Sequence, residues 1–246
     1  MEIAKTMDYG DSHRRFLKCL MAANNVVAQN KTIEMYCQCR NGDDDKMPED
    51  ATLDVGIPKF IEQINQQIEP LNLSIKLVTC EATGEKFYVL YTAQENELTK
   101  LVAARQWGRN ERMVLKTIVR SIVSSSHGKV TVATCARDCA ELPDKIKRAD
   151  VVKALETLLR ENWLIEVDGH VYIGTRSMVE LKKFLMDEFK EQAGICKLCI
   201  ELALRGESCP SNCGVKVHQT CKKVYFSKSK KQVCMGCSKP WPDSDK

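Results

Sequence analysis

The chain has 246 residues, of which 43% are hydrophobic and 28% charged, and its formal net charge is +4. This apolar fraction excludes a wholly disordered chain, and no run of about 18 uncharged apolar residues is present to cross a bilayer. The first ten residues contain Glu2 and Asp8 and lack the apolar segment of a secretory signal, so we expect a soluble intracellular protein without a membrane partner.

The first part of the chain, residues 1–106, has the pattern of three helices followed by a β-hairpin. Apolar residues recur three and four positions apart in the helical stretches, and then alternate with polar residues on either side of the turn at Thr83 and Gly84. Helices are expected at 12–28, 32–40 and 58–69, and strands at 73–77 and 87–91. This order is that of a winged helix, and the acidic segment 42–50 is expected to be a solvated connector.

The same order of elements repeats in residues 107–193. Asp168 and Gly169 form a two-residue turn that is a strong hairpin signal. Helices are expected at 114–122, 132–140 and 150–163, the last of them capped by Asp150, and strands at 164–167 and 170–173. These elements predict a second winged helix.

A capping box of Ser177 and Glu180 predicts one further helix, ending at Gly194, that links the second winged helix stiffly to the C-terminal segment. The expected fold class is therefore α+β. It comprises two tandem winged helices, at 1–106 and 107–193, followed by a small domain at 194–246.

Neither predicted third helix carries the excess of Lys and Arg with which a winged helix normally binds phosphates and bases. Residues 58–69 have one basic and two acidic side chains, and residues 150–163 have two basic and three acidic. The basic run 145–148 is interpreted as a solvated loop. We therefore expect the winged helices to bind protein, and direct DNA binding by this chain alone to be weak or absent.

Cysteine is concentrated near the end of the chain. Seven of the thirteen cysteines lie in residues 196–237, and the odd total argues against a complete disulfide framework. In the reducing compartment expected here, clustered cysteines hold metal more often than they pair with each other. With one histidine they form four closely spaced pairs, namely Cys196 and Cys199, Cys209 and Cys213, His218 and Cys221, and Cys234 and Cys237. Eight such ligands suit two tetrahedral zinc ions.

The spacing leaves two ways of sharing these ligands. In an interleaved cross-brace, the first and third pairs hold one zinc and the second and fourth hold the other. In sequential pairing, consecutive pairs share an ion, which gives two separate zinc sites along the chain. Either arrangement makes closed structural sites without an open position for hydrolytic chemistry. Because the segment has little apolar material, the metals are expected to supply much of its folding energy, on the order of 10 kcal/mol per site.

The order of four cysteines, one histidine and three cysteines is similar to RING-variant ubiquitin ligases and to PHD fingers. Gln232 stands where PHD fingers carry a signature tryptophan, and Leu198 stands where RING domains carry an aliphatic contact to a ubiquitin-conjugating enzyme. A more specific family resemblance is carried by four further features of this segment. They are Cys213-Gly214, His218 to Cys221, Tyr225-Phe226 and the tail Pro240-Trp241-Pro242. With its two winged helices, the whole chain resembles the first non-SMC element family, the RING subunit of the SMC-type chromosome complex for DNA repair.

This resemblance implies a nuclear, chromosome-associated protein that pairs with a MAGE-domain subunit through its winged helices and with the kleisin subunit. It also implies a RING-type ubiquitin-protein ligase that depends on the MAGE partner. The implied cross-brace places one zinc on Cys196, Cys199, His218 and Cys221 and the other on Cys209, Cys213, Cys234 and Cys237.

Leu198, Phe226 and Met235 are then expected to face the conjugating enzyme, with Lys239 near ubiquitin. Many active RING domains have proline at the position of Met235. Many also have arginine after the last ligand, where this chain has Ser238 and Lys239. Both differences predict weak intrinsic ligase activity.

Two alternatives stay open at this point. The RING-like fold could be a zinc-stabilised scaffold that docks neighbouring subunits without catalysis, and Tyr225 and Phe226 could pack inside the module instead of facing a partner. The lysines at 222–223 and 228–231 could attract DNA or act as an import signal, although a solvated face is the expected role.

The remaining cysteines and histidines are expected to carry no chemistry. The pairs Cys37/Cys39 and Cys135/Cys139 are interpreted as core or helix-face residues and not as a third metal site. The three other histidines, His13, His127 and His170, are interpreted as surface or strand residues.

Overall fold

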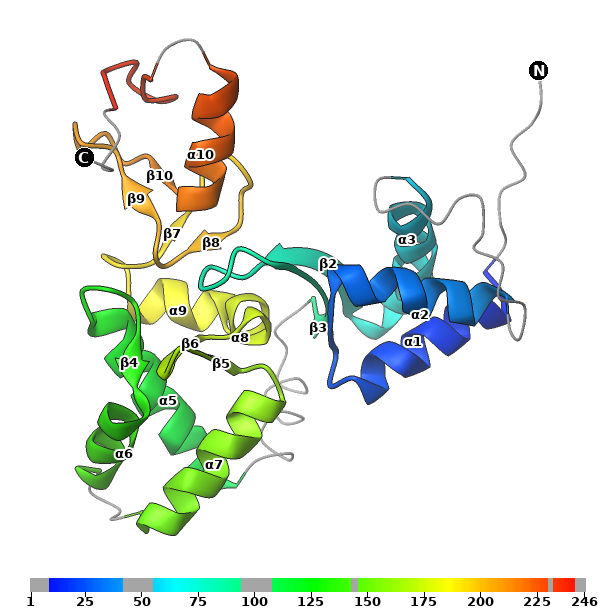
Figure 1. Cartoon of the computed structure of the whole chain (residues 1–246), viewed down its shortest axis with the longest axis horizontal. Coiled ribbons are helices and arrows are strands. Elements are labelled where there is room, and N and C mark those ends of the chain that lie inside the picture. Colours follow the sequence, from blue (N-terminus) through cyan, green and yellow to red (C-terminus); the bar gives the residue numbers. More distant parts are fainter. Residues whose placement is uncertain (1–8, 42–54, 94–107, 143–145, 230–231, 242–246) are drawn as a thin grey trace.

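The chain folds into two helix-and-strand units followed by a small module (Figure 1). The computed structural model describes residues 9–41, 55–93, 108–142, 146–229 and 232–241. The α+β class is confirmed, with two winged helices ahead of a small C-terminal module. The acidic segment 42–50 and the predicted boundary at residue 106 lie outside the described residues. None of the helices in the described part is long and apolar enough to cross a membrane.

The first winged helix packs three helices against an antiparallel sheet of strand order β1-β3-β2. Its elements are α1 (Asp11–Ala22), β1 (Val26–Ala28), α2 (Gln29–Asn41), α3 (Gly56–Ile68), a 3-10 turn (Glu69–Leu71), β2 (Leu73–Thr79) and β3 (Lys86–Thr92). The apolar stripe of α3 lies against Phe16 of α1 and Tyr36 of α2, and Phe60 contacts both rings edge-on. The helical periodicity of the sequence therefore marks the residues that fill this core.

The predicted first helix is wrong at its C-terminal end. Helix α1 stops at Ala22, because Asn24 and Asn25 adopt left-handed backbone angles (φ of 56° and 67°) that a right-handed helix cannot continue through. The next three residues form β1, whose Val26 and Val27 are buried where the strand pairs with β3. A three-residue strand is too short for a periodic signal, so only pairing with a strand about sixty residues away defines it.

His13 also differs from expectation, since it is 3% exposed instead of lying on the surface. Its ring stacks on Phe60 at 4.1 Å between centroids, and its Nε2 lies 3.0 Å from Oε1 of Gln63. Burial lowers the pKa of this imidazole. His13 is thus part of the core of the first winged helix, while His127 is in an exposed turn and His170 is in strand β6.

The second winged helix repeats the topology, with strand order β4-β6-β5. Its elements are α5 (Arg109–Ser124), β4 (Val130–Thr131), α6 (Val132–Ala140), α7 (Arg148–Arg160), β5 (Leu164–Val167) and β6 (His170–Ile173). Helix α7 begins two residues before the predicted cap, with Lys147 at the N-cap, so Asp150 lies in the first turn and does not cap it. Arg148 is therefore helical and not part of a loop, while Lys145 lies outside the described residues.

The predicted linker helix is two short helices, α8 (Thr175–Glu180) and α9 (Lys182–Glu188), which end before Gly194. Ser177 does not cap either helix, because it lies inside α8 and its hydroxyl donates to the carbonyl of Trp163 at 2.6 Å. Glu180 instead accepts from Nε of Arg176 at 2.8 Å, and the Arg176 guanidinium stacks over the ring of Trp163. A buried polar network, and not a capping box, thus sets the position of α8.

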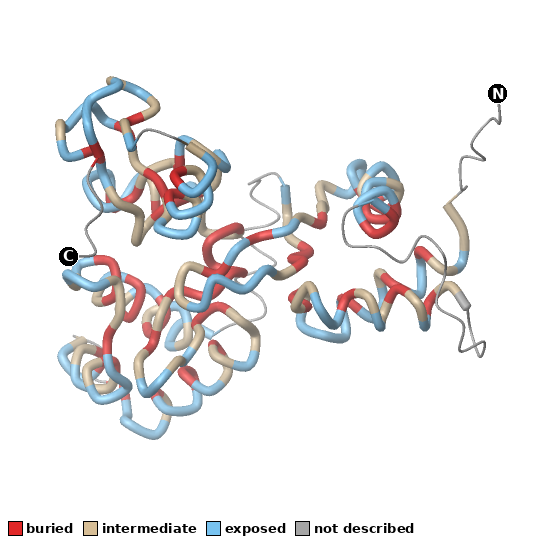
Figure 2. The backbone as a smooth tube through the Cα atoms, turned by 45° about the horizontal axis from the view of Figure 1, so that its top comes forward, coloured by how far each residue is buried: buried red, intermediate tan, exposed pale blue. Residues whose placement is uncertain are grey.

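Helix α8 also joins the two winged helices. The outer face of the first sheet buries Val26, Val78 and Val89 together with Val179 of α8. Figure 2 shows buried positions continuing along the β2–β3 hairpin to this contact. The hairpin, which is the wing of the first winged helix, extends beyond it toward the C-terminal module (Figure 1). The wing is thereby held between the other two parts of the chain.

Candidate metal centre

The C-terminal module is built from short strands and one helix that hold its cysteines in turns. Its elements are β7 (Gly194–Ile195), β8 (Leu202–Ala203), β9 (Glu207–Ser208), β10 (Lys216–Val217) and α10 (Gln219–Lys228). The first and last cysteine pairs each lie in a tight turn, closed by a backbone hydrogen bond from Ile200 to Cys196 and from Ser238 to Cys234, both 2.9 Å. Ile200 and Ser238 have left-handed backbone angles, φ of 63° and 57°. Such angles are costly for a β-branched residue like Ile200.

The structure gathers the eight side chains into two groups of four. Within each group the ligand atoms all lie within 4.8 Å of one another. The first group is Cys196, Cys199, His218 and Cys221, and the second is Cys209, Cys213, Cys234 and Cys237. The arrangement is interleaved along the chain and not sequential, because the third pair joins the first and the fourth joins the second.

The distances within the groups fit tetrahedral metal coordination. Sγ of Cys209 lies 3.7 Å from that of Cys237, and Sγ of Cys213 lies 3.6 Å from that of Cys234. Four thiolates at about 2.3 Å from a tetrahedral zinc lie about 3.8 Å apart, whereas a disulfide holds its sulfurs at about 2.0 Å. The described cysteines are all free thiols. The donor set and its spacing therefore suit a metal ion in each group.

His218 presents one ring nitrogen to the thiols and the other to the protein. Its Nδ1 lies 3.3 Å from Sγ of Cys199 and 3.7 Å from Sγ of Cys221, while its Nε2 lies 2.9 Å from the carbonyl oxygen of Leu202. A metal bound at Nδ1 leaves the proton on Nε2, where it donates to that carbonyl. The ring is therefore oriented as a metal-binding histidine requires.

Cys196 lies in a setting that favours the thiolate. Burial by itself raises the pKa of this thiol, but hydrogen bonds from the backbone N–H groups of Cys199, His218 and Leu198 outweigh the burial and bring the pKa to about 7. Because the thiolate is the form that coordinates metals, these backbone hydrogen bonds prepare Cys196 for a cation.

Two cysteines of the second winged helix lie in an environment that favours the neutral thiol. Burial raises the pKa of Cys135 to about 12 and that of Cys139 to about 11. They belong to the core of the second winged helix, whereas Cys37 and Cys39 belong to that of the first. The two pairs are therefore not brought together, and in the described part of the chain the metal-suited groups are the two in the module.

A groove of about 810 Å³ opens beside the first group. It is bordered by Leu198 and by Val224 and Tyr225 of α10, with Val224 56% exposed. The opposite wall is the first wing. Its lining is completed by Thr79, Gly84, Lys86, Cys199, Thr220, Cys221, Lys228 and Ser229. Of the residues expected to face a conjugating enzyme, Leu198 is the one in this groove.

The other expected contact residues lie elsewhere. Phe226 is 8% exposed and packs 6.2 Å from the ring of Trp241 in the core of the module, so it has the packing role that was the alternative. Met235 is partly buried against the same core, and Lys239 is exposed after the last cysteine. Phe226 thus offers no surface to a partner, and Val224 and Tyr225 occupy the position expected for it.

One lysine of the basic cluster is not on a solvated face. Lys222 is 4% exposed, and its ammonium group lies 2.6 Å from Oε2 of Glu207. Lys223 and Lys228 are exposed, and Lys230 and Lys231 lie outside the described residues. The cluster is therefore smaller than the sequence indicates, since one of its charges is neutralised inside the module.

Contacts between the module and the first wing had no signal in the sequence. Lys76 of β2 lies 2.8 Å from Oε2 of Glu201, and Oε1 of Glu81, in the wing turn, lies 3.2 Å from Nε2 of His218. These partners are more than 120 residues apart in the chain. A single charged residue in a turn or a strand gives no sequence signal for a partner at that distance. The wing therefore reaches a residue of the candidate metal centre.

Comparisons with known proteins agree with this architecture. Residues 13–127 match the model of the Nse1 non-SMC component of the SMC5-6 complex, and residues 196–237 match a RING-like domain. The chain is 27% identical over 233 residues to the non-structural maintenance of chromosomes element 1 homolog of Xenopus laevis, which covers 94% of this chain and 83% of that protein. The Homo sapiens homolog is 26% identical over 233 residues, covering 94% of this chain and 84% of that protein.

A solved structure of the Nse1-Nse3-Nse4 complex contains a similar chain. The two superpose with a TM-score of 0.75 at 26% identity, covering 99% of both chains. The fold of the two chains is thus similar over nearly the full length. Over nearly its full length the chain is therefore similar to Nse1, the non-SMC component of the SMC5-6 complex.

Proposed function

We propose that this chain is a RING-type ubiquitin-protein ligase subunit of an SMC5-6-type complex, and that it holds two structural zinc ions. The observation that carries the ligase proposal is the groove beside the first group of ligands. Its apolar rim, formed by the exposed Val224 and the partly buried Leu198, lies next to turns that a metal would make rigid. A small rigid surface of this kind suits the docking of a conjugating enzyme.

In this mechanism the chain forms no bond to ubiquitin. The zinc ions, when bound, supply stiffness, and the ligand sets leave no open coordination position for hydrolysis. Leu198 and the neighbouring side chains of α10 hold the charged enzyme so that a substrate lysine meets the thioester, which is catalysis by proximity and orientation. A tenfold gain in rate needs only about 1.4 kcal/mol of preferential transition-state binding. Lys239, exposed after the last ligand, would lie near ubiquitin.

The proposed partners are a MAGE-domain subunit, a kleisin subunit and a conjugating enzyme, in the nucleus and on chromosomes. The similar solved chain, which belongs to an Nse1-Nse3-Nse4 complex, supports the first two. The helix bounds bear on direct DNA binding, because α3 carries one basic and one acidic residue and α7 carries three basic and two acidic. Their net charges are therefore 0 and +1 instead of the predicted −1 each. Neither is a strong basic surface, so we keep the proposal that DNA binding by this chain alone is weak or absent.

Reconstituted auto-ubiquitination, with and without the MAGE-domain partner, tests the ligase activity. Leu198→Ala removes the apolar rim of the groove and is expected to abolish the signal. Ile200→Ala is the matched control, because Ile200 lies in the same loop, is 63% exposed and does not line the groove. Zinc content is measured for both variants, and a loss of activity counts only where two ions per chain are retained.

The competing function is a zinc-stabilised scaffold that docks neighbouring subunits without catalysis. The polar contacts from Glu81 and Lys76 to the module favour it, because they fix the module on the winged helices. Under this alternative the wild-type chain shows no ubiquitin transfer with the partner present, and Leu198→Ala changes nothing.

A further inference from the structure

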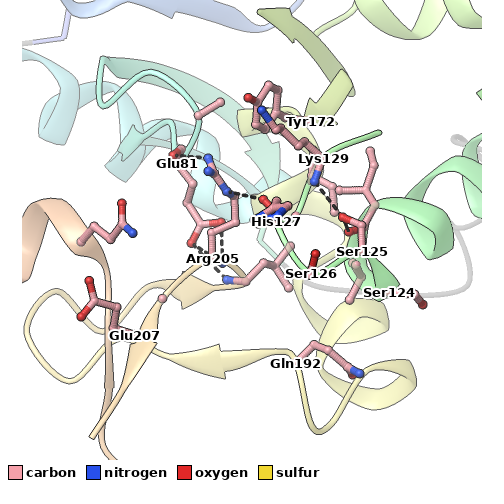
Figure 3. Close-up of a pocket in the computed structure, with 18 of the residues that line it drawn as sticks. Glu81, Ser124, Ser125, Ser126, His127, Lys129, Tyr172, Gln192, Arg205 and Glu207 are labelled. Carbon is pink, nitrogen blue, oxygen red and sulfur yellow. Dashed lines mark hydrogen bonds between the residues drawn. The ribbon is translucent and has the colours of Figure 1, made fainter. Parts of the chain in front are cut away.

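Glu81 in the turn of the first wing is almost fully enclosed by the C-terminal module. Its side chain is 10% exposed, and Oε1 accepts a hydrogen bond from the backbone N–H of Leu204 at 3.0 Å. The backbone N–H of Arg205 donates to both carboxylate oxygens, at 3.3 and 3.2 Å. The Arg205 guanidinium in turn donates to the carbonyl of Glu81 at 3.0 Å and to that of His127 at 3.2 Å (Figure 3).

These hydrogen bonds hold the Glu81 carboxylate in place, and the same carboxylate also reaches a candidate metal ligand. The remaining neighbour of Oε1 is Nε2 of His218, at 3.2 Å. The opposite ring nitrogen, Nδ1, faces the thiols of Cys199 and Cys221. The Nε2 proton, which the Leu202 carbonyl accepts at 2.9 Å, is thus shared with the Glu81 carboxylate. The carbonyl already fixes the tautomer, and the carboxylate adds a negative charge that holds the ring orientation and makes the coordinating nitrogen a better donor. The wing thus delivers a negative charge to the one nitrogen ligand of the module.

We infer that Glu81 is a positioning residue for the first metal centre, which therefore depends on a side chain of a different domain. The inference rests on the proposed zinc binding. Carboxylate, imidazole and thiolates form a continuous chain from the first winged helix into the module. The module consequently completes its first metal centre only when it is docked on the wing.

The second group of ligands provides an internal comparison. It consists of four cysteines and contains no histidine. Among the described contacts, the wing residues reach Glu201, Leu204, Arg205 and His218, but none of the four cysteines of this group. A change at Glu81 is therefore expected to act on one of the two zinc ions and to spare the other.

The test measures zinc release from the full chain. A colorimetric chelator follows the two ions over time in the wild type, in Glu81→Gln and in Glu81→Ala. Glu81→Gln keeps the size of the side chain and an acceptor oxygen but removes the charge. Changes to the partner of a metal-binding histidine weaken metal binding by about 10–100-fold. We expect one release phase to accelerate by that factor, more for the alanine variant, while the other stays at the wild-type rate.

Lys76→Ala is the matched control, because Lys76 comes from the same hairpin and bonds Glu201 of the same module without touching a ligand. It is expected to leave both release phases unchanged. Cobalt substitution identifies the affected site, since a centre with one nitrogen and three sulfur ligands absorbs differently from one with four sulfurs. In Glu81→Gln the first of these two spectra is expected to be lost preferentially.

Four results would overturn the inference. The release phases could be unchanged in both Glu81 variants, or Lys76→Ala could accelerate release as strongly as Glu81→Gln, which would assign the effect to docking alone. Loss of both ions together would mean a general failure of the module to fold. A wild-type chain without zinc would overturn the proposed function as well, and that outcome is separated from the others because it appears before any variant is made.

Discussion

In the second winged helix the core is made of aliphatic side chains such as Ile118 and Leu158, both fully buried. In the C-terminal module, by contrast, three of the eight buried core residues are the candidate ligands Cys196, Cys209 and Cys234. A buried aliphatic side chain contributes about 1.5–3 kcal/mol, so a winged helix accumulates its stability from many such residues. The module has too few of them, and under the proposed zinc binding it takes its stability from the metals. The two kinds of core should therefore fail under different conditions.

Chelation is expected to have the largest effect, because each structural zinc contributes on the order of 10 kcal/mol to folding. A strong chelator should unfold residues 194–241 and leave the winged helices intact. Hydrogen exchange followed segment by segment measures this, with Trp241 reporting on the module and Trp163 on the second winged helix. Continued protection of the module in chelator would contradict the comparison.

Cysteines of the two regions provide the next test. Cys209→Ser is expected to release the second zinc and to remove most of that site's stabilisation. Cys135→Ala is its control, because Cys135 is fully buried in the other kind of core and should cost only about 1 kcal/mol without loss of metal. Zinc content and thermal unfolding of both variants distinguish the two roles. Equal loss of zinc in the two variants would show that the two cores are not independent.

A substitution in the aliphatic core of the second winged helix is expected to lower stability without loss of zinc. Ile118→Ala leaves a cavity in the second winged helix and should lower the free energy of unfolding by about 2–5 kcal/mol. The zinc stoichiometry should stay at the wild-type value, as measured on the folded fraction. Ile118→Val, which removes a single methylene, should cost about 0.5–1.5 kcal/mol at the same site.

The contact between the two kinds of core is expected to give the smallest effect. The Lys76–Glu201 pair is partly exposed, with side chains 23% and 36% accessible. Because solvent screens such a pair, Lys76→Ala should change the free energy of unfolding by about 0.2–1 kcal/mol. Denaturant unfolding at low and high salt measures the contribution, which should shrink as the salt concentration rises.

Local patterns in the sequence predicted most of the fold. The helical periodicity of α3 and the Asp168–Gly169 turn are signals carried by a few neighbouring residues, and both elements are present. Predictions failed where distant contacts decide. Strand β1 exists because β3 pairs with it, and Ser177 looks like a cap but bonds the carbonyl of Trp163. Local propensity rules do not take account of β3 or Trp163, because both partners are distant in the sequence.

The candidate site divides in the same way. The short gap within each pair places its two side chains close together, so the candidate ligands can be named from spacing alone. The grouping of the pairs was open from spacing, and the structure has the interleaved arrangement. The burial of Phe226 and of Lys222 depended on which face of α10 packs inward, and the sequence of this helix has no periodic signal strong enough to decide it.

The sequence by itself determined the candidate ligands, the winged-helix order and the resemblance to Nse1, because each depends on residues that are close together in the chain or on motifs kept at fixed spacing. Only the tertiary structure decided that the first wing lies against the module and that Glu81 touches His218, 137 residues away. That contact arises when two separately specified units dock. Its energy depends on the complementary shape and charge of the wing and the module, and the sequence of either segment alone does not specify that complementarity.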